Sequence, residues 1–151
     1  MISTALGEAW DRTASSGEEN GLFMVYDAKA NSVHVGVASQ GTHIKDPSGG
    51  SMPAMPNYGK DYNAFVKSLG MKVSYLTDVH THPFKSDYPS GHDVQALHEL
   101  GGAGAKGLIM FGKGKFSIYS IVGKVPYPES AMKDCLTERV NQNSVHVRFR
   151  Q

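Results

Sequence analysis

The segment from His80 to Asp93 places the strongest constraint on what this chain can fold into. His80 and His82 are separated by one residue at the end of a run that is predicted to be a strand over residues 72–80. Side chains two positions apart on a strand point to the same side, so one metal ion can reach both imidazoles. Asp93 follows where we expect the first turn of the next helix, whose free amide groups favour a carboxylate. The segment therefore predicts a metal site held by His80, His82 and Asp93.

The types of these three side chains indicate the kind of metal site. Two histidines and one carboxylate leave one position of a tetrahedral zinc ion open for water, which distinguishes catalytic from structural zinc sites. Water at such a site still needs a base, and a glutamate suits that role. Glu18 and Glu19 directly precede the first predicted strand, and position alone does not choose between them. Ser90, three residues before the aspartate, is placed to donate a hydrogen bond to an oxyanion.

Length and composition exclude several other classes of protein. The 151 residues suit one domain, 1–151, and the single cysteine, Cys135, rules out an internal disulfide. A zinc deaminase is excluded as well, because its site needs a Cys-x-x-Cys pair. Fifteen Lys and Arg against fourteen Asp and Glu give no broad basic surface. We therefore expect neither nucleic acid nor an anionic membrane as a partner.

The apolar runs bear on localisation. None approaches the roughly 18 residues of a membrane span, and the N-terminal residues lack the basic stretch and apolar core of a signal peptide. We expect a cytoplasmic protein, or one that is delivered by a secretion system that needs no signal peptide.

The rest of the chain predicts alternating helices and strands. Helical spacing predicts helices over residues 3–14, 60–69 and 94–100, each followed by glycine. Apolar or alternating runs predict one hairpin from residues 21–26 and 32–38 and another from residues 107–111 and 115–122. Residues 40–57, rich in Gly, Pro, Ser and Met, predict an irregular functional loop, and residues 145–149 predict an edge strand. Asp78 and Asp87 are expected to be turn or edge residues. Asp87 is placed to help orient the segment between His82 and Asp93, which is called the ligand loop below.

At this point the chain resembles the JAMM or MPN-plus zinc metalloproteases, also called JAB domains. The shared pattern is His80-Thr81-His82-Pro83 followed by Ser90-Gly91-His92-Asp93. A Glu-x-x-Gly motif, present here as Glu18-Glu19-Asn20-Gly21, precedes the first strand. The order of the predicted elements fits the family over residues 1–122 and leaves 123–151 as a C-terminal extension.

The resemblance implies a fold and roles for particular residues. The fold is α/β (α+β), an MPN/JAB-like (cytidine-deaminase-like) three-layer arrangement with a central mixed β-sheet flanked by helices. Glu18 is the catalytic base by this match, because it stands three residues before Gly21, and Glu19 is the fallback. Ser90 is the oxyanion donor, and the cofactor is Zn²⁺.

The resemblance also implies an activity, namely hydrolysis of a peptide or isopeptide bond by metal-activated water in a protein or peptide substrate such as a ubiquitin-like tail. Bacterial branches of the family add alternatives: an effector or toxin module with a cognate partner or immunity protein, or a cell-wall peptidase delivered by a secretion or phage-tail system. The short span from Asp93 to Lys106 leaves no room for the insertion with which eukaryotic deubiquitinases grip ubiquitin, and residues 40–57 are the predicted substrate wall instead. A non-catalytic MPN scaffold usually lacks one or more ligands, whereas all three are present here.

Overall fold

A computed structural model describes residues 2–45, 49–70, 75–84, 86–101, 105–127, 131–132 and 134–150. The described helices are α1 (Ile2–Ser16), α2 (Tyr58–Leu69) and α3 (Gly91–Gly101). The described strands are β1 (Gly21–Asp27), β2 (Ser32–Val37), β3 (His43–Lys45), β4 (Ser51–Pro53), β5 (Tyr75–Thr81), β6 (Lys106–Gly112), β7 (Lys115–Ile121), β8 (Cys135–Asn141) and β9 (Ser144–Phe149).

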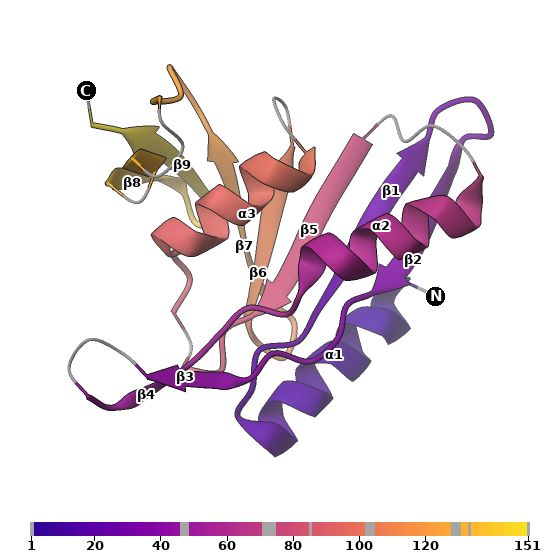
Figure 1. Cartoon of the computed structure of the whole chain (residues 1–151), viewed down its shortest axis with the longest axis horizontal. Helices are drawn as coiled ribbons and strands as arrows, with labels where there is room; N and C mark the ends of the chain where they lie inside the picture. The colour runs from indigo at the N-terminus through magenta and orange to yellow at the C-terminus, as the bar shows by residue number, and fades with distance from the viewer. Residues whose placement is uncertain are drawn as a thin grey trace.

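The strands form a seven-stranded mixed sheet in the order β2-β1-β5-β6-β7-β9-β8 and a separate two-stranded sheet, β3-β4. Helices α2 and α3 cover one face of the large sheet, and α1 covers the other (Figure 1). β5 lies near the middle and pairs antiparallel with β1 and parallel with β6. The expected α/β class, with a central mixed sheet flanked by helices, is confirmed.

The first helix and the first hairpin form where the sequence predicts them. α1 ends at Gly17, whose φ of 73° is left-handed and whose amide donates to the carbonyl of Thr13 at 2.8 Å. β1 then pairs with β2 as an antiparallel hairpin. The apolar residues of β1 are buried on both faces of the sheet. Leu22 packs with Ala9 of α1 on one face, whereas Phe23 packs with Tyr58 of α2 on the other.

The second predicted helix is α2, which begins at Tyr58. The side chain of Asn57 accepts a hydrogen bond from the amide of Lys60 at the start of the helix, and Gly70 closes it with a φ of 62°. Tyr58, Tyr62 and Phe65 pack around the ring of Phe23, with centroid distances of 5.6 to 5.9 Å. This aromatic cluster holds α2 against β1.

The expectation that residues 40–57 form no regular element is wrong. β3 and β4 pair antiparallel, with Ile44 opposite Met52. The segment is also tied to the start of β1, because the amide of Gly41 donates to the carbonyl of Glu19 at 2.8 Å. A side chain at position 41 would collide with the carbonyl oxygen of Ala54 at 2.1 Å, so a glycine is required at this close approach.

The C-terminal strands extend the same large sheet. The predicted strand at residues 145–149 is β9, but it does not lie at the edge: it runs parallel to β7 and lies between β7 and β8. Its side chains Val145, Val147 and Phe149 are buried in the core under α3. β8, which no sequence pattern predicts, is the edge strand at this end of the sheet.

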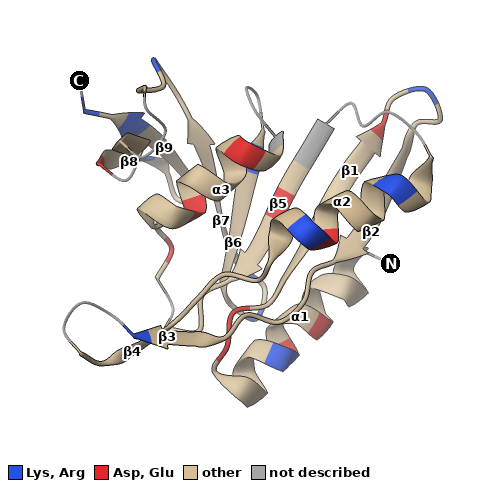
Figure 2. Cartoon of the chain, in the orientation of Figure 1, with Lys and Arg blue, Asp and Glu red and all other residues tan. Residues whose placement is uncertain are grey.

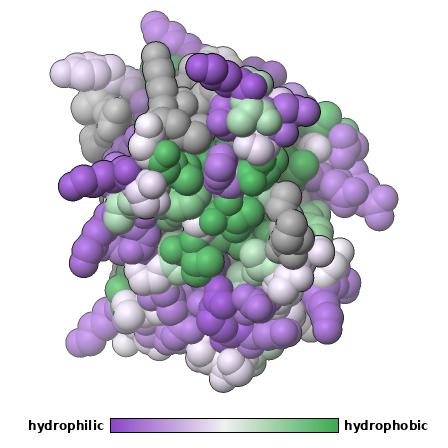
Figure 3. Space-filling model, turned by 90° about the vertical axis from the view of Figure 1, so that its right-hand side faces the viewer, coloured by the Kyte–Doolittle hydropathy of each residue, from purple (hydrophilic) through white to green (hydrophobic). Residues whose placement is uncertain are grey.

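The described surface shows no concentration of one charge. Lys and Arg occur together with Asp and Glu on α1 and α2, whereas the charged residues of α3 are acidic (Figure 2). Seen from the β2 edge, hydrophilic side chains surround an apolar patch (Figure 3). On β2 itself, Val33 and Val37 are 46% and 60% exposed. In the part of the chain that the structure describes, no helix is long and apolar enough to cross a membrane.

Candidate metal centre

His80, His82 and Asp93 converge at the end of β5. The two histidines lie on the face of β5 toward α3, and Asp93 lies in the first turn of α3. The Nε2 atoms of the two imidazoles are 3.0 Å apart, and each lies 3.2 Å from Oδ2 of Asp93. His80 is fully buried and Asp93 nearly so. The structure thus brings together the three side chains that the sequence predicts as metal ligands.

The spacing of these three atoms fits one metal ion. Ligand atoms about 2.0 to 2.2 Å from a tetrahedral zinc ion lie about 3.3 Å from one another, close to the separations found here. His82 also has a suitable tautomer, because its Nδ1 lies 2.8 Å from the carbonyl oxygen of Ser86, which only accepts hydrogen bonds. The Nδ1 atom therefore carries the proton, and the lone pair of Nε2 faces the other two ligands.

A fourth side chain, Glu19, completes the group. One carboxylate oxygen of Glu19 and the ligand atoms of His80, His82 and Asp93 all lie within 4.8 Å of one another. Glu19 is 8% exposed, and its Oε1 atom is buried without a hydrogen-bond partner among the described residues. These four residues are called the metal cluster below, and together they can hold a metal ion.

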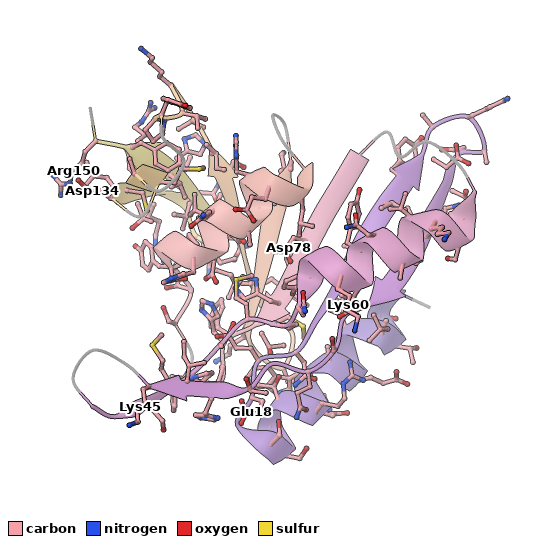
Figure 4. All side chains as sticks on the ribbon, viewed as in Figure 1. Glu18, Lys45, Lys60, Asp78, Asp134 and Arg150 are labelled. Carbon is pink, nitrogen blue, oxygen red and sulfur yellow. The ribbon has the colours of Figure 1, made fainter. Side chains whose placement is uncertain are left out.

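Glu18 lies outside the metal cluster. Its carboxylate pairs with Nδ1 of His43 at the start of β3, near the end of α1 (Figure 4). Of the two glutamates that the sequence offers as base, the structure therefore places Glu19, the fallback, with the ligands, and it engages Glu18 elsewhere. Successive side chains along an extended chain point to opposite faces of a sheet. Gly21 pairs with His80, so the two positions share a face. Glu19, two residues before Gly21, lies on that same face, whereas Glu18 lies on the other.

A hydrogen-bond network on the opposite face of β5 fixes the segment that carries Glu19. Thr81 points away from the two histidines, and its hydroxyl accepts from the amide of Asn20 at 2.8 Å and lies 2.5 Å from the hydroxyl of Thr13 on α1. The side-chain amide of Asn20 donates to the same Thr13 hydroxyl at 3.1 Å. All three residues are buried. Glu19, next to Asn20, is thereby held over the histidines.

Burial and charge shift the pKa values in the metal cluster. Burial raises the pKa of Glu19 to about 7, although the imidazole of His80 acts in the opposite direction. Burial would also raise the pKa of Asp93, but His80 and His82 hold it well below its usual range. Burial would lower the pKa of His80, but the charge of Asp93 outweighs this and raises it. Two buried carboxylates beside two imidazoles make a pocket that favours a cation.

A second polar network lies behind His80. Asp78 is fully buried on β5, on the side of α2 and α3 (Figure 4), and burial raises its pKa to about 6. The hydroxyl of Tyr119 donates to its carboxylate at 3.4 Å, and the hydroxyl of Tyr58 donates to the adjacent carbonyl of Val79. The expectation of a turn or edge position for Asp78 is therefore wrong. Asp87 lies in the ligand loop and pairs with Arg139 of β8.

Two glycines, Gly21 and Gly107, leave the space beside β5 that these tyrosines occupy. A Cβ at Gly21 would lie 1.8 Å from the hydroxyl oxygen of Tyr58, and one at Gly107 would lie 2.0 Å from the ring of Tyr119. Larger residues at either position would displace a tyrosine from its hydrogen bond. In the sequence, the close approach of the tyrosines is indicated only by the presence of these two glycines in otherwise apolar strands.

A groove of about 550 Å³ opens onto the metal cluster. Glu19, His82, Ser90 and Asp93 line one end of it. The β3-β4 pair forms one wall and the ligand loop forms the other. The cluster is therefore accessible to a substrate along this groove.

Comparison with protein-family models and with curated proteins found no match for this chain. The geometry of the metal cluster and the groove beside it therefore carries the functional argument.

Proposed function

We propose that the protein is a zinc-dependent hydrolase that cleaves a peptide or isopeptide bond. The observation that carries this proposal is the convergence of His80 Nε2, His82 Nε2 and Asp93 Oδ2 within 3.2 Å of one another. Glu19 stands beside them at the end of an open groove. A purely structural metal site needs neither a nearby unpaired carboxylate nor access for substrate.

Zinc is the metal that suits this donor set. Imidazole nitrogen atoms favour zinc over magnesium or calcium, which prefer oxygen ligands throughout. His80, His82 and Asp93 would hold the zinc ion, which would supply Lewis-acid activation of water near neutral pH. The second histidine of the pair, His82, reaches the groove, whereas His80 lies fully buried beneath it.

The side chains around the zinc divide the remaining tasks. Glu19, which we propose as the base in place of Glu18, accepts a proton from the attacking water and delivers it to the leaving nitrogen as the carbon–nitrogen bond breaks. Ser90 lines the groove next to Asp93, and its hydroxyl donates to the carbonyl oxygen as negative charge develops there. Thr81 and Asn20 hold the base in place without touching the substrate.

We also propose that the fold is of the MPN/JAB type. The order α1, β1-β2, α2, β5, ligand loop, α3 and β6-β7 supports this, because it is the order expected from the JAMM resemblance. The β3-β4 pair occupies the segment expected to supply the substrate wall, and it lines the groove. β8 and β9 form the C-terminal extension.

The test is hydrolysis by zinc-loaded protein of three kinds of substrate: a quenched peptide library, an isopeptide-linked ubiquitin-like conjugate and bacterial cell-wall peptides. We expect cleavage of at least one of the three kinds of substrate, and the one that is cleaved identifies the substrate class of the protein. Glu19→Gln should bind zinc and abolish that cleavage. Zinc binding without hydrolysis of any of the three would contradict the proposal and leave a metal-bound scaffold.

A further inference from the structure

The groove beside the metal cluster is polar at one end and apolar along the rest of its length. Ile44 and Met52 project into it from the β3-β4 pair, and Phe84 and Tyr88 from the ligand loop. All four are large apolar or aromatic side chains with substantial exposure, from 37% for Tyr88 to 76% for Phe84. Met55 and Pro83 extend the same walls toward the cluster. Contact of large apolar side chains with water is unfavourable, so a group of them on a surface often marks a binding site.

Charge is confined to the end at the metal cluster. Among the described lining residues, the only carboxylates are those of Glu19 and Asp93, and no Lys or Arg side chain lines the groove. The other lining residues that can carry charge are His82 and His92. Arg139, which stacks 4.9 Å from the centre of the Tyr88 ring, is already paired with Asp87. An acidic or basic group in the apolar part would therefore find no Lys, Arg or further carboxylate among the described lining residues to pair with. The lining therefore favours an uncharged apolar ligand group.

We infer that this groove binds a bulky apolar side chain, such as Leu, Met or Phe, next to the bond that is cleaved. The inference rests on the proposed function, because it names the substrate class of the same site. The volume of about 550 Å³ lies within the range of small-ligand pockets and exceeds what glycine or alanine would fill. Met52 and Met55 are unbranched and adaptable, so several apolar side chains fit between the two walls.

Three residues of the metal cluster and the apolar side chains line the same groove, so one extended peptide can contact both. Its carbonyl group lies at the end formed by Ser90 and Glu19, and its apolar side chain lies between Met52 and Phe84. A substrate with a small residue at this position leaves the walls exposed to water. Complete burial of a Leu or Phe side chain raises affinity about ten- to a hundredfold over glycine.

The test uses capped pentapeptides, acetyl-Ala-Ala-Xaa-Ala-Ala-amide, in which Xaa is Leu, Phe, Met, Gly, Asp or Lys. Hydrolysis by the zinc-loaded wild-type protein is measured by mass spectrometry, and binding to zinc-loaded Glu19→Gln is measured by NMR titration. We expect Leu, Phe and Met to exceed Gly, Asp and Lys at least about tenfold in both assays. The binding assay reports on the groove even if no peptide is cleaved.

Two variants and a matched control locate the preference. Met52→Gln keeps the length of an unbranched side chain but makes it polar, and Phe84→Ala removes a ring from the opposite wall. In each, the ratio of Leu to Gly binding should fall at least threefold. Val33→Gln, which replaces an exposed apolar side chain by a polar one on β2, outside the groove lining, should leave the ratio unchanged.

The two proposals fail in different ways. Equal cleavage and equal binding of the Gly and Leu peptides would overturn the groove inference and leave the hydrolase intact. Preferential binding of apolar peptides, with no hydrolysis of these peptides or of any of the three kinds of substrate named above, would support the groove inference and contradict the proposed activity. An apolar preference that survives both Met52→Gln and Phe84→Ala would overturn the assignment of this groove.

Discussion

Ser90 and Asp93 exchange two hydrogen bonds at the start of α3. The amide of Asp93 donates to Oγ of Ser90 at 3.1 Å, and the amide of Ser90 donates to Oδ2 of Asp93 at 2.8 Å. This is the reciprocal arrangement of a capping box, with aspartate in the place of glutamate. Ser90 therefore orients Asp93 of the metal cluster by accepting a hydrogen bond from its amide, and in the proposed mechanism its hydroxyl proton is donated to the substrate.

The two roles of Ser90 can be separated by a pair of variants. Ser90→Ala should lower kcat about a hundredfold, because it removes the donor to the oxyanion, and should cost about 1 kcal/mol of stability, because it removes the helix cap. Ser90→Gly removes the same donor but costs only a few tenths of a kcal/mol, since glycine is tolerated at a helix start. Measurements of kcat, zinc content and melting temperature on both variants check this. Full activity of both at saturating zinc would rule out the oxyanion role.

The two glutamates should respond differently to the same change. Glu19→Gln should retain zinc but lower kcat by about a hundredfold to ten thousandfold, because it removes the proton acceptor beside the ligands. Glu18→Gln should have little effect, since it loses only a partly exposed pairing with His43. Steady-state kinetics and metal analysis of the two proteins decide the matter. The opposite pattern would return the base to Glu18.

The convergence of His80, His82 and Asp93 was predictable from sequence, whereas the position of Glu19 beside them was not. His80 and His82 share a face because of the two-residue period of a strand, and Asp93 falls in a helix start that Ser90 marks. The glutamates precede a run, Gly21 to Tyr26, that is apolar on both faces of the sheet. Such a run does not show whether its odd or its even residues lie on the face that carries His80. The choice between Glu18 and Glu19 therefore needed the register of β1 against β5.

Other parts of the fold lacked a sequence signal for a physical reason. β8 carries mostly exposed, polar side chains because it is an edge strand, so no burial selects an alternating pattern. β3 and β4 are three residues each and are held by the loop at Gly41 and by contacts with the start of β1. Asp78 resembles a turn residue in sequence, and its burial within β5 depends on long-range contacts, among them those with Tyr58 and Tyr119.

Thr81 should act on the position of Glu19 and on stability, because its hydroxyl joins Asn20 and Thr13 behind the metal cluster. Thr81→Val keeps the shape but leaves the buried amide of Asn20 without its partner, which should cost about 1 to 3 kcal/mol in the free energy of unfolding. Zinc should still bind, since Thr81 points away from the histidines. Urea unfolding checks the loss, with Thr81→Ser as the control that retains the hydroxyl. Unchanged stability in Thr81→Val would contradict the role of the network.

Gly21 should tolerate no side chain. Gly21→Ala places a methyl group against the hydroxyl of Tyr58 and the carbonyl of Val79, and overpacking of this kind costs about 1 to 3 kcal/mol. The matched control is Gly7→Ala in α1, where a Cβ has no neighbour within 4 Å. Gly7→Ala should stabilise the protein by up to about 1 kcal/mol, because alanine has the higher helix propensity. Thermal unfolding of the two variants should therefore show shifts of opposite sign.

The metal content of the purified protein tests the central claim most directly. Under zinc-replete conditions, elemental analysis should find close to one zinc per chain, because His80, His82 and Asp93 lie at ligand spacing. His82→Ala should lose the metal, while His92→Ala, which changes an exposed histidine of the same segment outside the metal cluster, should keep it. A folded wild-type protein without zinc, or a His82→Ala variant that retains it, would contradict the account.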